Sequence, residues 1–169
     1  KSNVILITHY FSGTSHAAGK YQATDAVPGY WDAIIGPCKA IDTSKFYVVS
    51  MDTLVNANVK DPNVITTGPA SIDPATGKPY GLSFPVVTIT DFVEVQKAFL
   101  ESKGINTLYA VIGPSMGSFQ AIEWASRYPK RVKRLIAAIG TAHIDSWNAV
   151  RLERWAEPIK ADPNWQQGD

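Results

Sequence analysis

The five residues Gly113-Pro114-Ser115-Met116-Gly117 are the part of this sequence best suited to covalent chemistry. Their pattern is G-x-S-x-G, with an apolar run before it (107–113) and a helix-like pattern after it (118–128). A serine on a sharp turn between a strand and a helix holds its hydroxyl exposed and can act as a nucleophile. A chance match in a plain loop is the alternative. The flanking strand and helix favour the nucleophile.

A serine nucleophile also needs N–H donors for the negative charge that develops on the substrate oxygen. The amide of Met116 would lie in the first turn of the following helix, where the helix dipole favours negative charge. A second donor is expected from the loop after an earlier strand. The segment THYFSGTSH (8–16) follows the first apolar run, and Phe11 is the best candidate for that amide. A plain turn explains this loop equally well.

The acid and base that would activate the serine are not evident in this sequence. Its three histidines are His9, His16 and His143. For His9 and His16, which lie in or next to the same loop, we expect a structural or hydrogen-bonding role. Asp145 is better explained as a helix N-cap than as a catalytic acid. No histidine has the spacing of a zinc site, so no metal is predicted.

Four apolar runs predict the strands that position these residues, and three helical patterns alternate with the later ones. The runs suit buried parallel strands covered by helices on both faces, with Trp124 in the core. The predicted strands lie in 3–11, 45–52, 107–113 and 132–140, and the predicted helices span 90–103, 118–128 and 146–160. Residues 53–88 are rich in proline and glycine, but interleaved apolar residues favour ordered coil over a flexible linker.

Length and composition suit one domain with a hydrophobic core. The chain has 169 residues, of which 45% are hydrophobic, and a net charge of +1. This charge gives no electrostatic reason to expect nucleic acid or an anionic membrane as a partner, and no apolar run is long enough to span a bilayer. The single cysteine, Cys38, excludes an internal disulfide; we expect it to be a small buried residue, and the chain to be cytoplasmic.

Several longer segments together resemble the homoserine O-acetyltransferase family, whose members have the α/β-hydrolase fold. The resemblance covers nearly the whole chain and is more specific than G-x-S-x-G alone. It is carried by THYFSGTSHAAG, YWDAIIGPCKAIDTSKFYVVSMD, the TTGPASIDPATGKPYG segment, GPSMGSFQAIEWASRYPKRV and ADPNWQQGD.

This resemblance implies a Ser-Asp-His triad and acetyl transfer in two steps, from acetyl-CoA to the serine and then to a hydroxyl acceptor such as homoserine. By position, Ser115 is the nucleophile, and Phe11 and Met116 are the backbone donors. No permanently bound cofactor is implied, and acetyl-CoA is the expected co-substrate. The family's Asp and His lie downstream of a helical lid, beyond the residues of this chain.

The resemblance also implies that this chain is the N-terminal portion of the fold. Residues 1–143 are expected to form a partial α/β-hydrolase core and 144–169 the start of the lid, with open sheet edges. The expected partner is the remaining C-terminal segment that carries the Asp and His, and a second copy of the chain is a further candidate.

Three hypotheses about the function follow from these observations. The first is a serine O-acyltransferase. The second is an esterase of the same fold with water as acceptor, because THYFSGTSH and RLERWAEPIK depart from the usual pattern of the homoserine enzymes. The third is an inactive fragment that acts as a binding module.

Overall fold

The computed structural model describes residues 3–165, which divide into two compact units. Of the described residues, the first unit contains 3–66 and 87–140, and the second contains 67–86 and 141–165. The candidate site residues Phe11, Ser115 and Met116 all belong to the first unit.

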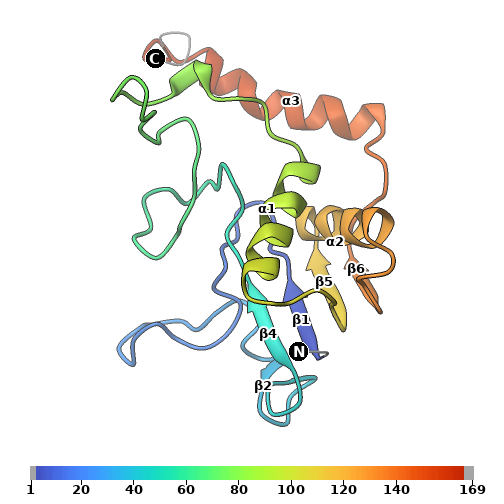
Figure 1. Cartoon of the computed structure of the whole chain (residues 1–169). Coiled ribbons are helices and arrows are strands. Elements are labelled where there is room, and N and C mark those ends of the chain that lie inside the picture. The colour runs from blue at the N-terminus through green and yellow to red at the C-terminus, as the bar shows by residue number, and fades with distance from the viewer. Residues whose placement is uncertain (1–2, 166–169) are drawn as a thin grey trace. The chain divides into compact units, whose positions relative to one another are not determined.

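A four-stranded parallel sheet forms the centre of the first unit (Figure 1). The strand order is β4-β1-β5-β6, so β1 and β5 are internal and β4 and β6 are edges. The strands are β1 (Val4–Ile7), β4 (Tyr47–Ser50), β5 (Ala110–Pro114) and β6 (Leu135–Ala138). All four were predicted from the apolar runs, and the parallel direction is confirmed.

One face of this sheet packs against two helices, α1 (Ile89–Ser102) and α2 (Met116–Arg127). Leu6 and Val111 of the sheet meet Val93 of α1 and Trp124 of α2 in one buried cluster. Trp124 is fully buried, and its indole N–H donates to the side chain of Gln96 at 2.8 Å. The predicted core position of Trp124 is therefore confirmed.

The other face is covered differently from the prediction. We expected helices on both faces, but Ile5, Ile7 and Ile112 pack beneath the irregular segment 17–46. That segment contains only the short paired strands β2 (Ile35–Gly36) and β3 (Ile41–Asp42). Aromatic side chains from the segment complete the layer, because rings can bury apolar area without a regular element.

Cys38 corrects a second expectation, since its side chain is exposed and not buried. It lies at the tip of the turn between β2 and β3 with a positive φ of 61°. The Asp42 carboxylate accepts hydrogen bonds from the Ser44 hydroxyl and from the amides of Ser44 and Cys38, which fixes this turn and lowers the pKa of Asp42. A turn tip of this kind offers no core for the thiol.

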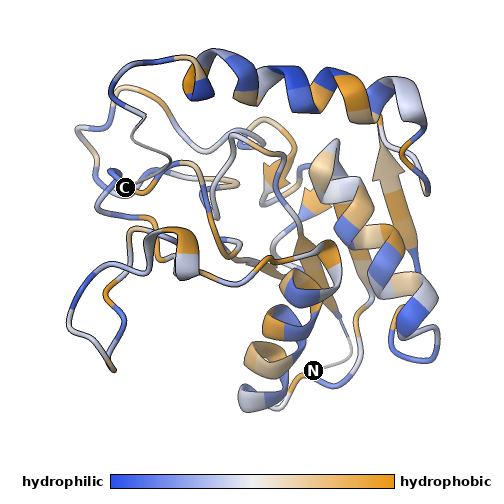
Figure 2. Cartoon of the chain, turned by 90° about the horizontal axis from the view of Figure 1, so that it is seen from above, coloured by the Kyte–Doolittle hydropathy of each residue, from blue (hydrophilic) through white to orange (hydrophobic). Residues whose placement is uncertain are grey.

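The edge strand β6 is more exposed than its apolar sequence predicted. Leu135 and Ile136 are 42% and 53% exposed, whereas the residues of β1 are all buried. Within residues 3–165, β6 pairs with β5 alone. Figure 2 shows the strands as hydrophobic along their length. Strand β6 is therefore apolar in sequence, as a buried strand would be, although its side chains Leu135 and Ile136 are exposed.

The second unit holds the short 3₁₀ helix η1 (Gly81–Ser83) and the helix α3 (Ser146–Lys160). The predicted bounds of α3 are confirmed, and Asp145 caps it by accepting the Asn148 amide at 2.8 Å. Trp147 and Trp155 are 71% and 64% exposed. No helix among the described residues is long and apolar enough to cross a membrane.

Candidate active site

Ser115 occupies a strained turn between β5 and α2. Its backbone angles are φ 52° and ψ −122°, a region that residues with a Cβ rarely adopt. Such a conformation costs on the order of 1–3 kcal/mol and persists only where the surroundings impose it. The Ser115 amide donates to the Ala138 carbonyl of β6 at 2.9 Å, and its carbonyl accepts from the Ser118 amide at 2.8 Å.

Glycines at three positions allow the chain to pack this tightly around the serine. A Cβ on Gly113 would overlap the Gly117 carbonyl and the Thr8 hydroxyl. A Cβ on Gly117 would overlap the Thr8 carbonyl, and one on Gly140 would overlap the Ser118 hydroxyl. The first two glycines belong to the predicted motif. Gly140 was not expected to touch the turn, because it lies after the neighbouring strand β6 and is distant from the motif in sequence.

Thr8 joins this turn to the end of β1. Its hydroxyl is fully buried and donates to the Gly117 carbonyl at 2.7 Å. Sequence reasoning missed Thr8, although a polar residue at the end of an apolar strand was a usable signal. The contact aligns the carboxyl ends of β1 and β5, which is where ligands bind to open α/β sheets.

Met116 is the first residue of α2, directly after Ser115. First-turn amides of a helix have no acceptor within the helix, and they carry its positive dipole end. The amide of Met116 is therefore suited to an anion beside Ser115. The oxyanion role of this amide remains a prediction.

Phe11 lies in the turn that follows β1. The Gly13 amide donates to the Tyr10 carbonyl at 2.9 Å and closes this turn around Phe11 and Ser12. The start of this turn lies close to α2. A Cβ on Gly117, in the first turn of α2, would lie 3.0 Å from the His9 carbonyl. The structure thus brings the loop of Phe11 to the helix start of Met116.

His9 and His16 use their rings for local hydrogen bonds in this unit. His9 is completely buried, lies 2.7 Å from the Tyr10 carbonyl through Nδ1, and accepts the Thr53 amide at Nε2 at 3.2 Å. Burial lowers the pKa of His9. The His16 ring reaches the Gly19 carbonyl at 2.8 Å and stacks on Tyr21. Both placements agree with the predicted hydrogen-bonding role.

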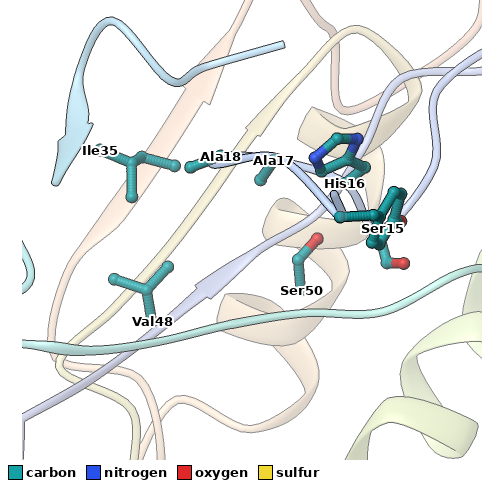
Figure 3. Close-up of a pocket in the computed structure, with 8 residues that line it drawn as sticks. Ser15, His16, Ala17, Ala18, Ile35, Val48 and Ser50 are labelled. Carbon is teal, nitrogen blue, oxygen red and sulfur yellow. The ribbon is translucent and has the colours of Figure 1, made fainter. Parts of the chain in front are cut away.

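A hollow of about 300 Å³ lies elsewhere in the first unit, between the 15–18 segment and strand β4 (Figure 3). Its lining includes His16, Ala17, Val48 and Ser50. None of its lining residues belongs to the turn at Ser115 or to the Tyr10–Gly13 turn. Among residues 3–165, no group of three or more His, Cys, Asp or Glu side chains could hold a metal ion.

Comparisons with known proteins agree with this geometry. The sequence model of the family described as "alpha/beta hydrolase fold" matches residues 27–169. A homoserine O-acetyltransferase of Solidesulfovibrio magneticus is 44% identical over 99% of this chain and 41% of its own length. The resemblance indicated by the sequence segments is therefore confirmed.

Two solved structures superimpose closely on the chain. Esterase E22 is 69% identical with a TM-score of 0.96, and the match covers 99% of this chain and 45% of that one. A homoserine O-acetyltransferase from Bacillus anthracis is 48% identical with a TM-score of 0.97 and the same coverage. The chain thus spans less than half the length of the relatives it matches, and it belongs to the α/β-hydrolase fold family.

Proposed function

We propose that the longer protein containing this chain is a serine enzyme that cleaves esters through an acyl-enzyme on Ser115. The observation that carries this proposal is the strained backbone of Ser115 at the start of α2, beside the end of β1. Structure of this kind raises a serine hydroxyl above the sheet and aims a helix amide at the same point. Packing alone gives no reason to store strain at a serine.

The proposed chemistry has two halves. Ser115 Oγ attacks the ester carbonyl, its proton passes to a histidine base, and the alcohol leaves with that proton. In the tetrahedral intermediate, the oxygen that takes up the negative charge accepts hydrogen bonds from the amides of Met116 and Phe11. Water then attacks the acyl-Ser115, and the carboxylic acid is released.

The base and its orienting aspartate are proposed to come from a C-terminal segment outside these residues. His9 and His16 are engaged with backbone carbonyls, and Asp145 caps α3. The exposed apolar strand β6 is a suitable place for that segment to add its own strands. Residues 144–169 are proposed to begin a helical lid.

Identity among relatives favours water as the acceptor. The chain is 69% identical to esterase E22 and 48% identical to the Bacillus anthracis homoserine O-acetyltransferase. Acetyl transfer from acetyl-CoA to homoserine is the second candidate, supported by the Solidesulfovibrio magneticus and Bacillus anthracis enzymes. Both reactions use the same acyl-Ser115 and differ in the group that resolves it.

One experiment separates these candidates. The longer protein is incubated with p-nitrophenyl acetate or acetyl-CoA, with and without homoserine, and the products are identified by mass spectrometry. We expect acetate from the ester in the absence of homoserine. O-acetylhomoserine as the main product would instead establish the transferase.

The serine itself is tested by Ser115→Ala in the same protein. Loss of a serine nucleophile lowers kcat by roughly a millionfold in comparable enzymes. We expect such a loss with an unchanged circular dichroism spectrum. Full turnover by Ser115→Ala would refute the acyl-enzyme, and a wild-type protein without turnover on either donor would favour a binding module.

A further inference from the structure

We infer that His9 is a positioning residue: its neutral ring, protonated on Nδ1, orients the peptide whose Phe11 amide faces the reacting oxygen. The inference rests on the proposed acyl-enzyme at Ser115 and adds a residue that the triad does not contain. It follows from the hydrogen bonds of the His9 ring and from the planarity of one peptide bond.

The partners of the ring determine its protonation state. Nε2 receives the Thr53 backbone N–H at 3.2 Å, and a backbone N–H can only donate. Nε2 must therefore be unprotonated in this arrangement. The proton of the neutral ring is then on Nδ1, which donates to the Tyr10 carbonyl at 2.7 Å.

The Tyr10 carbonyl in turn fixes the direction of the next amide. This carbonyl accepts from the His9 ring and, at 2.9 Å, from the Gly13 amide. Peptide bonds are planar, and no peptide bond among residues 3–165 is cis, so the Phe11 N–H is antiparallel to the Tyr10 C=O. The Phe11 amide therefore points away from the buried His9 ring.

Two further carbonyls of the turn, those of Ser12 and Gly13, are held by the same loop that holds the ring. Asn56 donates through its side-chain amide to the Gly13 carbonyl at 3.1 Å, and Asn58 donates to the Ser12 carbonyl at 3.2 Å. Asn56 also lies 3.4 Å from His9 Nε2. The loop after β4 thus holds the Tyr10–Gly13 turn by its carbonyl groups.

Charge near the ring is consistent with a neutral imidazole. Asp52 is the charged group that acts on His9, and it raises the pKa of the ring, but burial lowers it by more. The Asp52 carboxylate is itself engaged by the Ser15 and Ile65 amides, at 2.6 and 3.0 Å. Protonation of Nε2 would place its N–H opposite the Thr53 N–H, and the hydrogen bond from Thr53 to the ring would be lost.

The test uses a pair of substitutions in the longer protein. The amide nitrogen of asparagine can take the place of Nδ1, whereas the amide of glutamine reaches the place of Nε2. We expect His9→Gln to lower kcat about 100-fold, in the range for losing one oxyanion donor, with KM changed less than about threefold. His9→Asn should retain more of kcat because it keeps the donor to Tyr10.

A transition-state analogue provides a readout that general destabilisation would not move. Binding of a trifluoromethyl ketone, which forms a tetrahedral adduct with the serine, should weaken in proportion to kcat across the two variants. His16→Gln is the matched control, since its ring bonds Gly19 outside the turn, and it should keep wild-type kcat. Equal kcat for His9→Gln and wild type, with Ser115→Ala inactive, would overturn the positioning role alone.

Activity in Ser115→Ala would instead remove the proposed function, and the positioning role with it. Where the His9 variants do not fold, long-range ¹H–¹⁵N spectra of the wild-type ring decide the matter. A ring protonated on Nδ1 supports the inference. A ring protonated on Nε2 contradicts it.

Discussion

The two turns that meet at the candidate site are built in different ways. The turn at Ser115 depends on steric fit, since a Cβ on Gly113 would overlap the Gly117 carbonyl and one on Gly117 would overlap the Thr8 carbonyl. The turn at Phe11 contains no comparable local constraint and is held by His9, Asn56 and Asn58. A steric fit tolerates no added atom, whereas a hydrogen-bonded fit can weaken by degrees.

Gly117→Ala should have the largest effect on stability, because it damages the contact between the two turns. Its Cβ would overlap the Thr8 carbonyl and crowd that of His9, and neither backbone group can move freely. We expect a loss of about 3 kcal/mol in urea denaturation, the upper end of the range for overpacking. Gly19→Ala is the control: nothing lies within 4 Å, and its φ of 74° alone should cost about 1 kcal/mol. Equal losses would show that crowding at Gly117 is unimportant.

Ser115→Gly isolates the strain of the first turn. Glycine adopts φ 52° without the steric penalty of a Cβ, whereas alanine retains it. Both substitutions remove the hydroxyl. We therefore expect the free energy of unfolding of Ser115→Gly, measured in urea, to be about 1 kcal/mol higher than that of Ser115→Ala. If Ser115→Ala is the more stable variant, the turn is not strained in the manner described.

Asn58→Ala weakens the second turn alone. It removes the donors to the Ser12 and Gly13 carbonyls at 3.2 and 3.3 Å, both near the surface. We expect a fall of about fivefold in kcat of the longer protein, equivalent to one hydrogen bond of about 1 kcal/mol, with stability nearly unchanged. Asn63→Ala is a control that should not change kcat, because the Asn63 side chain bonds Asp61 farther along the same loop.

Acid should affect the second turn before the first. The pKa of buried His9 is lowered from its usual value of 6.5, so below that pH the unfolded chain binds this proton more readily than the folded chain. The contribution of neutral His9 to stability is complete above pH 6.5 and is lost as the pH falls toward its folded pKa. We expect the wild type to lose more stability than His9→Gln between pH 7 and 5. Parallel curves for the two proteins would contradict a buried neutral ring.

Much of the fold could be predicted because it depends on local pattern. The apolar runs of β1, β4, β5 and β6 were recognised, and the helix from Ser146 to Lys160 was found with its N-cap. The irregular cover of the second sheet face was not predicted, since segment 17–46 has no periodicity. Exposed Cys38 was misjudged because a burial tendency averaged over proteins carries no information about one turn.

The sequence by itself determined the candidate nucleophile, because G-x-S-x-G between a strand and a helix contains its own steric reason. Only the tertiary structure revealed the roles of Thr8, Gly140 and His9, whose partners lie 109, 22 and 44 residues away along the chain. Hydrogen bonds between distant loops depend on where parallel strands end side by side. That arrangement is decided when the sheet forms, and no local pattern in the sequence encodes it.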